Sequence, residues 1–173
     1  MTSSYKSRAD LFAQFDSLSI AHKTHEHIPI FTVEEGAEIK AKLPGGHTKN
    51  LFLKDKSDAL FLVCALGDTH IAVNRLHKEL GCKRLSFGKP DLMLEHLGVT
   101  PGSVTLFAIM NDVSGAVTLV IDKALLAYDI VNFHPLKNDA TTAISSTDMI
   151  KFAKAVNHDP IIMDFEALAH TEN

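Results

Sequence analysis

The run from Ala59 to Leu66 constrains the fold most, because eight consecutive residues carry no charged or strongly polar side chain. Successive side chains of a strand point to opposite faces of its sheet, so a strand without polar positions is buried on both faces. We therefore predict a central strand here, in a sheet with helices packed around it. A hairpin-length spacer, Asp55 to Asp58, joins it to a short preceding strand, Leu51 to Leu53.

The remaining segments alternate irregularly between helical and strand patterns. Apolar residues at positions 11, 12, 15 and 18 have helical spacing, and Thr32 with Glu35 forms a capping box that opens a second helix. We expect one α+β domain spanning residues 1–173, with a mixed sheet of about seven strands. Further helices are predicted over 74–81, 89–97 and 148–156, and further strands over 22–28, 84–87, 104–110, 117–122, 129–135, 141–145 and 160–165.

Composition excludes several classes of protein. A hydrophobic content of 46% indicates a globular chain, and no apolar run approaches the ~20 residues of a membrane span. The first residues lack the apolar core of a signal peptide, and Cys64 and Cys82 form no close-spaced pair. We therefore expect a cytoplasmic protein without a membrane partner.

The net charge of −4 argues against broad nucleic-acid binding and predicts no DNA partner. It leaves room for a local basic patch, because several lysines fall close together. The alternative is that they only solvate the ends of a helix and a strand. These lysines are Lys40, Lys42, Lys49, Lys54 and Lys56.

The usual catalytic signatures are missing from the sequence: a G-x-S-x-G elbow, a P-loop, a dinucleotide-binding glycine fingerprint and H-E-x-x-H. Three segments remain that mix glycine with polar groups. They are Gly45 to Asn50, Gly98 to Thr105, and His134 to Thr142. We treat these three segments as the candidate sites.

Each candidate segment has a functional and a structural interpretation. Lys49 offers a point positive charge and Asn50 offers donors and an acceptor where a loop becomes a strand, but such a pair is also common on solvated surfaces. His134 follows a strand and precedes a proline, so it serves either a site or the local turn. The loop from Gly98 either presents its backbone to a ligand or only connects a helix to a strand.

A metal site is the weakest of these options. His25 and His27 share a face of a predicted strand, and a His-x-His pair is a common part of a metal site. No cysteine or third histidine lies at a spacing that completes the ligand set. We therefore predict neither a metal nor another cofactor.

Four segments taken together resemble a known family. They read F-T-V-E-E at 31–35, T-K-N-L-F-L-K-D at 48–55, L-G-V-T-P-G-S-V-T at 97–105 and N-F-H-P-L-x-N at 132–138. Each is short, but their order and spacing resemble the editing domain inserted in bacterial prolyl-tRNA synthetases, and more closely its freestanding relatives. Those relatives are trans-acting deacylases of mischarged tRNA, and their fold implies a curved mixed sheet.

The resemblance also implies roles for individual residues. Lys49 is the expected key residue, with Asn50 and His134 as further catalytic residues. The family loop usually reads G-x-x-x-P, whereas this chain has Leu106 where the proline is expected. The substrate-binding residues implied in this way are Gly45, Gly46, Thr48, Gly102, Ser103, Val104, Thr105 and Asn138.

The segments at 31–35 and 48–55 are most similar to the branch that clears alanine from proline tRNA, and a sister branch clears cysteine. The resemblance implies hydrolysis of the ester between amino acid and terminal ribose, assisted by substrate groups and without a protein nucleophile. The implied partners are the acceptor end of mischarged proline tRNA and prolyl-tRNA synthetase. Two alternatives stay open: a catalytically silent tRNA-binding or regulatory domain of the same fold, and a small-molecule or metal-binding protein.

Overall fold

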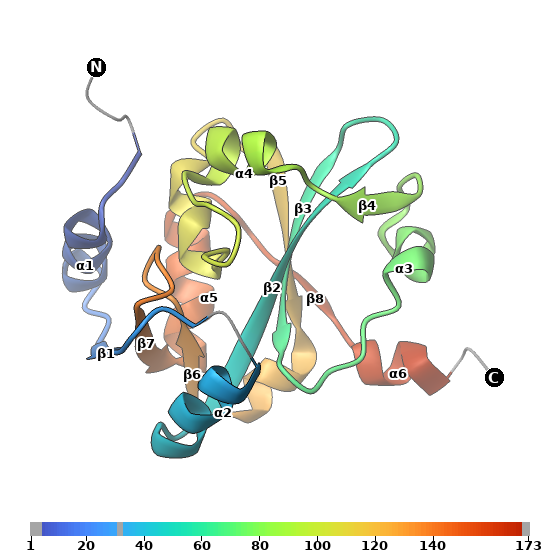
Figure 1. Cartoon of the computed structure of the whole chain (residues 1–173). Helices are drawn as coiled ribbons and strands as arrows, with labels where there is room; N and C mark the ends of the chain where they lie inside the picture. The colour runs from blue at the N-terminus through green and yellow to red at the C-terminus, as the bar shows by residue number, and fades with distance from the viewer. Residues whose placement is uncertain (1–4, 31–32, 171–173) are drawn as a thin grey trace.

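The structure is a computed structural model that describes residues 5–30 and 33–170. Its strands form one mixed sheet in the order β1-β7-β6-β2-β3-β5-β8, with β4 paired to β2 (Figure 1). The predicted mixed sheet surrounded by helices is confirmed, with eight strands where about seven were expected. The strands are β1 (Lys23–Glu26), β2 (Gly46–Asp55), β3 (Leu60–Leu66), β4 (Leu85–Phe87), β5 (Val117–Asp122), β6 (Ile130–Phe133), β7 (Ala140–Ser145) and β8 (Ile161–Met163).

Six α-helices and two short 3-10 helices are described along the chain, and the predicted capping residue Thr32 lies outside the described residues. Within the described ranges, none of the helices combines the length and the apolar character that a membrane span requires. The helices are α1 (Arg8–Ser17), α2 (Val33–Lys42), α3 (Val73–Leu80), α4 (Pro90–Leu97), η1 (Leu106–Asn111), η2 (Lys123–Ala127), α5 (Ser146–Ala155) and α6 (Phe165–His170).

Strand β3 is central, as predicted from its uniform hydrophobicity. It pairs antiparallel with β2 and parallel with β5, and residues 60–65 are buried. The predicted hairpin between β2 and β3 is also confirmed. The Asp55 carboxylate closes it by accepting from the amides of Ser57 and Ala59 at 2.8 and 2.9 Å.

Two apolar cores lie on the two faces of this sheet. Leu62 belongs to the larger core, with Phe15 of α1 and Phe152 of α5. Val63 belongs to the smaller core, on the side of α3 and α6. Figure 1 shows α1, α4 and α5 on one side of the sheet and α3 and α6 on the other. Successive side chains of β3 point to opposite faces of the sheet and therefore contribute to both cores.

Strand β2 is longer than the predicted segment 51–53, because it begins at Gly46. Its partner residues in β3 run without interruption from Leu66 opposite Thr48 to Leu60 opposite Lys54. Backbone hydrogen bonding does not require apolar side chains, so the hairpin ladder continues through polar residues. The interpretation that Lys49 and Asn50 mark a junction of loop and strand is therefore wrong: both lie inside β2.

The predicted strand over 104–110 is also wrong, because residues 106–111 form the 3-10 helix η1. The Thr105 hydroxyl caps this helix by accepting from the Phe107 amide at 3.3 Å. A fully buried apolar run is compatible with either conformation, so its pattern alone does not decide between strand and helix. Packing decides here, because the Phe107 ring centroid lies 5.1 Å from that of Phe15 and 5.2 Å from that of Phe133.

The two ends of the chain agree with the prediction only in part. The predicted tail strand, β8, is present at the edge of the sheet and pairs parallel with β5. The helix that follows it, α6, was not predicted. Strand β1 is shorter than the predicted 22–28 and pairs antiparallel with β7.

The buried Phe107 provides a test of this core. Phe107→Ala removes a ring with no exposed surface that contacts three other rings. We expect the free energy of unfolding to fall by about 3–5 kcal/mol, measured by urea denaturation. Phe87→Ala is the matched control, because Phe87 is 63% exposed. Similar losses in the two variants would contradict the assignment of Phe107 to the core.

Candidate active site

The candidate site is built around β2, which is paired differently along its two edges. One edge carries β3 from Thr48 to Lys54. The other edge pairs with β6 only at Gly46 and His47, and with β4 only from Leu53 to Asp55. Among the described residues, no strand pairs with the stretch between, which contains Thr48, Lys49 and Asn50. Polar side chains of β2 therefore lie beside a gap in the sheet.

A chain of side-chain hydrogen bonds crosses the point where the β2–β6 ladder ends. Thr48 Oγ1 donates to the carbonyl of Asn132 at 2.7 Å, and Asn50 Nδ2 lies 3.5 Å from the same hydroxyl. The Asn50 Oδ1 atom is buried and has no hydrogen-bond partner in the described part of the chain. A buried acceptor without a partner carries a desolvation cost that a bound donor would remove.

Lys49 and Asn50 point to opposite faces of the sheet, because they are neighbours in one strand. The Lys49 ammonium is half-buried and donates to the carbonyl of Thr69, in the loop after β3. One of its three donors is used in this way, and no hydrogen bond within residues 5–30 and 33–170 occupies the other two. The structure therefore directs these two side chains to different sides of β2 and does not bring them together.

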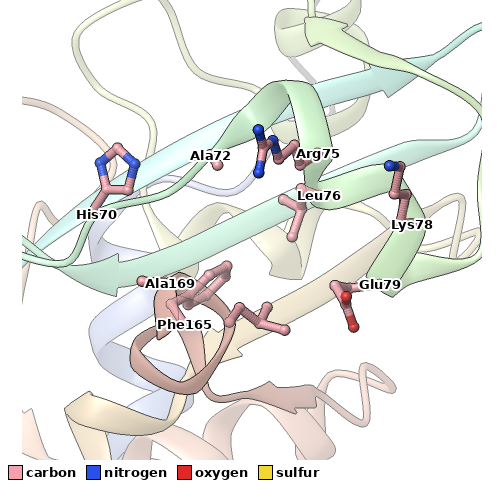
Figure 2. A pocket seen from close by; sticks show the side chains of 9 residues that line it. His70, Ala72, Arg75, Leu76, Lys78, Glu79, Phe165 and Ala169 are labelled. Atoms are coloured by element: carbon pink, nitrogen blue, oxygen red, sulfur yellow. The ribbon is translucent and has the colours of Figure 1, made fainter. Parts of the chain in front are cut away.

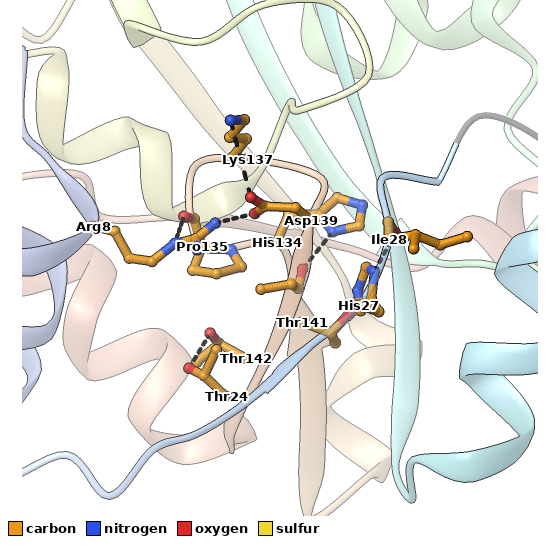
Figure 3. A network of polar contacts seen from close by, with 11 residues as sticks. Arg8, Thr24, His27, Ile28, His134, Pro135, Lys137, Asp139, Thr141 and Thr142 are labelled. Atoms are coloured by element: carbon orange, nitrogen blue, oxygen red, sulfur yellow. Dashed lines mark hydrogen bonds and ion pairs between the residues drawn. The ribbon is translucent and has the colours of Figure 1, made fainter.

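His134 directly follows β6 (Figure 3) and is half-buried. Its Nδ1 lies 3.1 Å from the carbonyl of Ala140. A carbonyl only accepts, so Nδ1 carries the proton and Nε2 keeps its lone pair, which no described residue occupies. Burial lowers the pKa of His134; the Ala140 carbonyl opposes this shift, nearby His27 adds to it and Asp139 opposes it. His134 is therefore a neutral base at neutral pH.

A pocket of about 350 Å³ lies between α2 and the sheet and contains two of the predicted site residues, Thr48 and His134. It also contains His47 and Thr141, which lie within the candidate segments but were not chosen as individual site residues. His47 lies two positions before Lys49 on the same strand, so alternation was the signal that could have identified it. The full lining is Ile30, Gly36, Ile39, Lys40, His47, Thr48, Asn132, Phe133, His134 and Thr141.

The glycine pair before β2 packs tightly against the protein itself. Gly45 has a φ of +98°, and a Cβ there would lie 2.6 Å from the carbonyl oxygen of Ile130. A Cβ on Gly46 would lie 3.1 Å from the ring of Tyr128. These glycines let β2 approach β6, and this close approach is the structural reason for their small size.

The loop after α4 lies beside the loop after β6. A Cβ on Gly102, whose φ is +88°, would lie 3.7 Å from Asn138 Nδ2, and that amide donates to the carbonyl of Ile30 at 3.2 Å. Ser103 and Thr105 are buried. Val104 packs against the larger core, and Leu106, at the family proline position, is fully buried at the start of η1. Gly102 and Asn138 are thus neighbours, while the residues that follow mainly support the loop.

A different pocket, of about 190 Å³, lies between α3 and α6 (Figure 2). It mixes the charged side chains of Arg75, Lys78 and Glu79 with the apolar side chains of Leu76 and Phe165. None of the predicted site residues lines it. Of the residues selected from the sequence, Thr48 and His134 lie in the pocket on the α2 side of the sheet, and none lies in this one.

Metal-ligating residues do not cluster in the described part of the chain, where no three histidine, cysteine or acidic side chains are grouped for a shared ion. The His25 and His27 rings lie 6.2 Å apart between centroids. His27 is engaged elsewhere, since its Nδ1 contacts the Ile28 carbonyl at 2.8 Å and its Nε2 contacts Thr141 Oγ1 at 2.9 Å. A reaction without a metal stays a prediction.

Comparison with known proteins gives consistent matches. A model of the aminoacyl-tRNA editing domain family matches residues 27–152. Prolyl-tRNA synthetase associated domain-containing protein 1 of Mus musculus is 40% identical over 164 residues, which are 92% of this chain and 96% of that protein. Prolyl-tRNA editing protein ProX of Acetoanaerobium sticklandii is 36% identical over 146 residues, which are 84% of this chain and 89% of that protein.

A solved structure described as "a putative trans-editing enzyme for prolyl tRNA synthetase" has the same fold. It covers 93% of this chain and 98% of its own, with a TM-score of 0.68 and 16% sequence identity. At this identity the likeness concerns the fold alone, and it agrees with the family match and the two relatives. The resemblance drawn from four short segments is therefore confirmed: this chain belongs to the aminoacyl-tRNA editing domain family.

Proposed function

We propose that this protein is a trans-editing hydrolase that removes alanine from mischarged proline tRNA. The family match and the likeness to the prolyl-tRNA editing protein ProX support a deacylase. The single structural observation that carries the proposal is the neutral His134, whose Nε2 lone pair is unoccupied within the pocket. We propose alanine rather than cysteine as the amino acid removed, because the segments at 31–35 and 48–55 are most similar to the branch that clears alanine.

The proposed reaction needs no protein nucleophile. Water attacks the ester carbonyl, the bond to the terminal ribose oxygen breaks, and a proton is transferred to that oxygen. The products are the free amino acid and a tRNA with a free ribose hydroxyl. His134 Nε2 accepts a hydrogen bond from the neighbouring ribose hydroxyl, which in turn orients the attacking water. Aminoacyl esters are reactive, so positioning and charge stabilisation supply the catalysis.

Lys49 and Asn50 complete the proposed site from β2. The two remaining Lys49 donors stabilise negative charge on the ester oxygen or the terminal phosphate. Asn50 Oδ1, which lacks a partner, accepts from the substrate's ammonium group. Gly102 and Asn138 border the space for the amino acid of the substrate. Gly45, Gly46, Thr48 and residues 103–105 hold the surrounding backbone in place.

The remaining parts of the proposal concern context. The chain acts as one editing domain over residues 1–173, in the cytoplasm, without a metal or other cofactor. Its partners are the acceptor end of proline tRNA and prolyl-tRNA synthetase, which produces the mischarged substrate. A pocket that excludes proline supplies the discrimination that binding by the synthetase alone does not achieve.

The substrate prediction is tested by loss of charge from alanyl-, cysteinyl- and prolyl-tRNA for proline, in buffer that contains a chelator. We expect the alanyl ester to be cleaved fastest and the prolyl ester to be spared, because a second sieve selects by size. Faster cleavage of the cysteinyl ester would contradict the choice of alanine and assign the protein to the sister branch that clears cysteine. Binding of tRNA without any loss of charge would favour the catalytically silent alternative.

Lys49→Ala is expected to lower the deacylation rate roughly ten- to a hundredfold, because one charge-assisted contact to the substrate is lost. The fold should persist, since a half-buried lysine contributes little to stability. Lys154→Ala is the control: it removes the same charge from an exposed position of α5. Equal losses in both variants would mean that Lys49 contributes only to a general positive field.

The lowered pKa of His134 predicts a pH dependence. Because the neutral imidazole is the active form, the rate should persist as pH falls past 6.5, the ordinary histidine value, and decline only below it. As pH falls below 6.5, the imidazole of His134 becomes protonated in the unfolded chain before it does in the folded chain. The free energy of unfolding should therefore fall as pH is lowered from 6.5 through the lowered pKa. His134→Gln should remove this acid limb from the pH–rate profile. An acid limb centred at or above 6.5 in the unaltered protein would refute this assignment.

A further inference from the structure

The first helix of the chain reaches the candidate site through one residue. Arg8 begins α1, outside the family match of residues 27–152. Its Nε donates to the carbonyl of Pro135 at 3.0 Å, and its Nη2 lies 2.5 Å from Asp139 Oδ1 (Figure 3). These contacts join parts of the chain that are 127 and 131 residues apart. Both contacted residues belong to the loop that follows His134.

That loop is held in a conformation that it does not favour by itself. Leu136 has a φ of +72°, which is strained for a residue with a branched side chain. Its amide donates to the His134 carbonyl at 2.9 Å, and His134 Nδ1 bonds the Ala140 carbonyl across the loop. The direction of the imidazole therefore depends on contacts that hold the loop from outside.

Two groups of contacts supply this restraint, and Figure 3 shows Arg8 on one side of the loop and His27 on the other. On one side, the His27 amide donates to the Asp139 carbonyl at 2.9 Å, and Ile30 and Asn138 bond each other through amide and carbonyl groups. On the other side lies Arg8. Its planar guanidinium binds a carbonyl and a carboxylate through two nitrogens held in a fixed geometry, which the single nitrogen of lysine does not reproduce.

Arg8 also controls charge beside the imidazole. Its hydrogen bond to Asp139 and its positive charge lower the pKa of that carboxyl group, so Asp139 is ionised. The Asp139 charge in turn acts to raise the pKa of His134. The other titratable or charged groups around His134 are His27 from the segment after β1, Lys137 from the loop itself, and Lys40 and His47 from the pocket walls.

We propose that Arg8 is a positioning residue for His134: it fixes the loop through Pro135 and Asp139 and offsets the carboxylate charge beside the imidazole. The proposal rests on the proposed function only in that His134 serves the reaction. The helix that carries Arg8 is independently secured, because Ser7 and Asp10 form a capping box and Leu11 and Phe15 are fully buried. Substitution of Arg8 therefore leaves α1 docked.

The test uses two single variants with opposite expected effects. Arg8→Gln removes one of the two cations beside Asp139 and leaves only Lys137, whose Nζ lies 4.0 Å from Asp139 Oδ2, so the pKa of His134 rises and the acid limb of the pH–rate profile moves to higher pH. Asp139→Asn removes that charge, so the limb moves to lower pH. Arg8→Gln combined with Asp139→Asn should return the limb close to its original position. In Arg8→Gln, kcat should also fall about tenfold with little change in KM, because a displaced imidazole affects the reacting complex.

Two further variants separate charge from geometry. Arg8→Lys keeps the charge but loses the second contact, so the limb should stay in place while kcat falls. Lys6→Gln is the control, because it removes the same charge two residues away, at an exposed position; both kcat and the limb should be unchanged. The proposal is overturned if Lys6→Gln matches Arg8→Gln, or if Arg8→Gln and Asp139→Asn move the limb in the same direction.

A measurement without substrate makes the two proposals separately testable. NMR titration of the His134 imidazole in the same variants should show the same opposite shifts, with Nδ1 protonated in the neutral form. If the unaltered protein cleaves no aminoacyl-tRNA, the proposed function fails while the NMR titration still decides whether Arg8 controls His134. If His134 titrates identically in the unaltered protein and in Arg8→Gln, the positioning proposal fails whatever the enzymatic result.

Discussion

The pairing of β2 is the constraint on which the rest of the site depends. One edge of β2 is fully committed to β3, while the other is shared between β6 at its start and β4 at its end. Between them the backbone edge carries no strand among the described residues, and the Thr48 hydroxyl takes the Asn132 carbonyl in place of a ladder bond. An unpaired stretch inside a sheet is costly in an ordinary core and useful beside a ligand, because polar groups stay available there.

The protonation state and the tautomer of His134 are determined by its burial and by one backbone carbonyl. The Ala140 carbonyl assigns the proton of His134 to Nδ1, and burial keeps the ring neutral. The same loop carries a strained Leu136. Strain of this kind persists only where several surrounding contacts determine the conformation together. The segment from His27 to Ile30 supplies part of these contacts and Arg8 supplies the rest, so the geometry of one imidazole is shared by elements far apart in the sequence.

Much of the fold was accessible from the sequence, because local signals and tertiary structure agree there. The uniformly apolar β3, the hairpin at Asp55 and the helices α3 and α4 were all predicted, and each of these two helices ends at a left-handed glycine. The conformation of residues 106–111 was not, since a buried apolar run fits a strand or a helix and only its aromatic neighbours decide. The positions of Lys49 and Asn50 in the sequence suggested one shared site, but their places in the middle of a strand direct them to opposite faces.

The residues that sequence reasoning missed show what remains inaccessible without the fold. His47 could have been found by alternation from Lys49, whereas Arg8 has no motif around it and lies in a helix whose pattern indicates only an amphipathic surface. Its contribution arises because β1 and β7 pair and thereby bring the segment after α1 alongside the loop after β6. A charged residue at a helix start is usually solvated; here tertiary pairing converts it into a contact with the loop that orients His134.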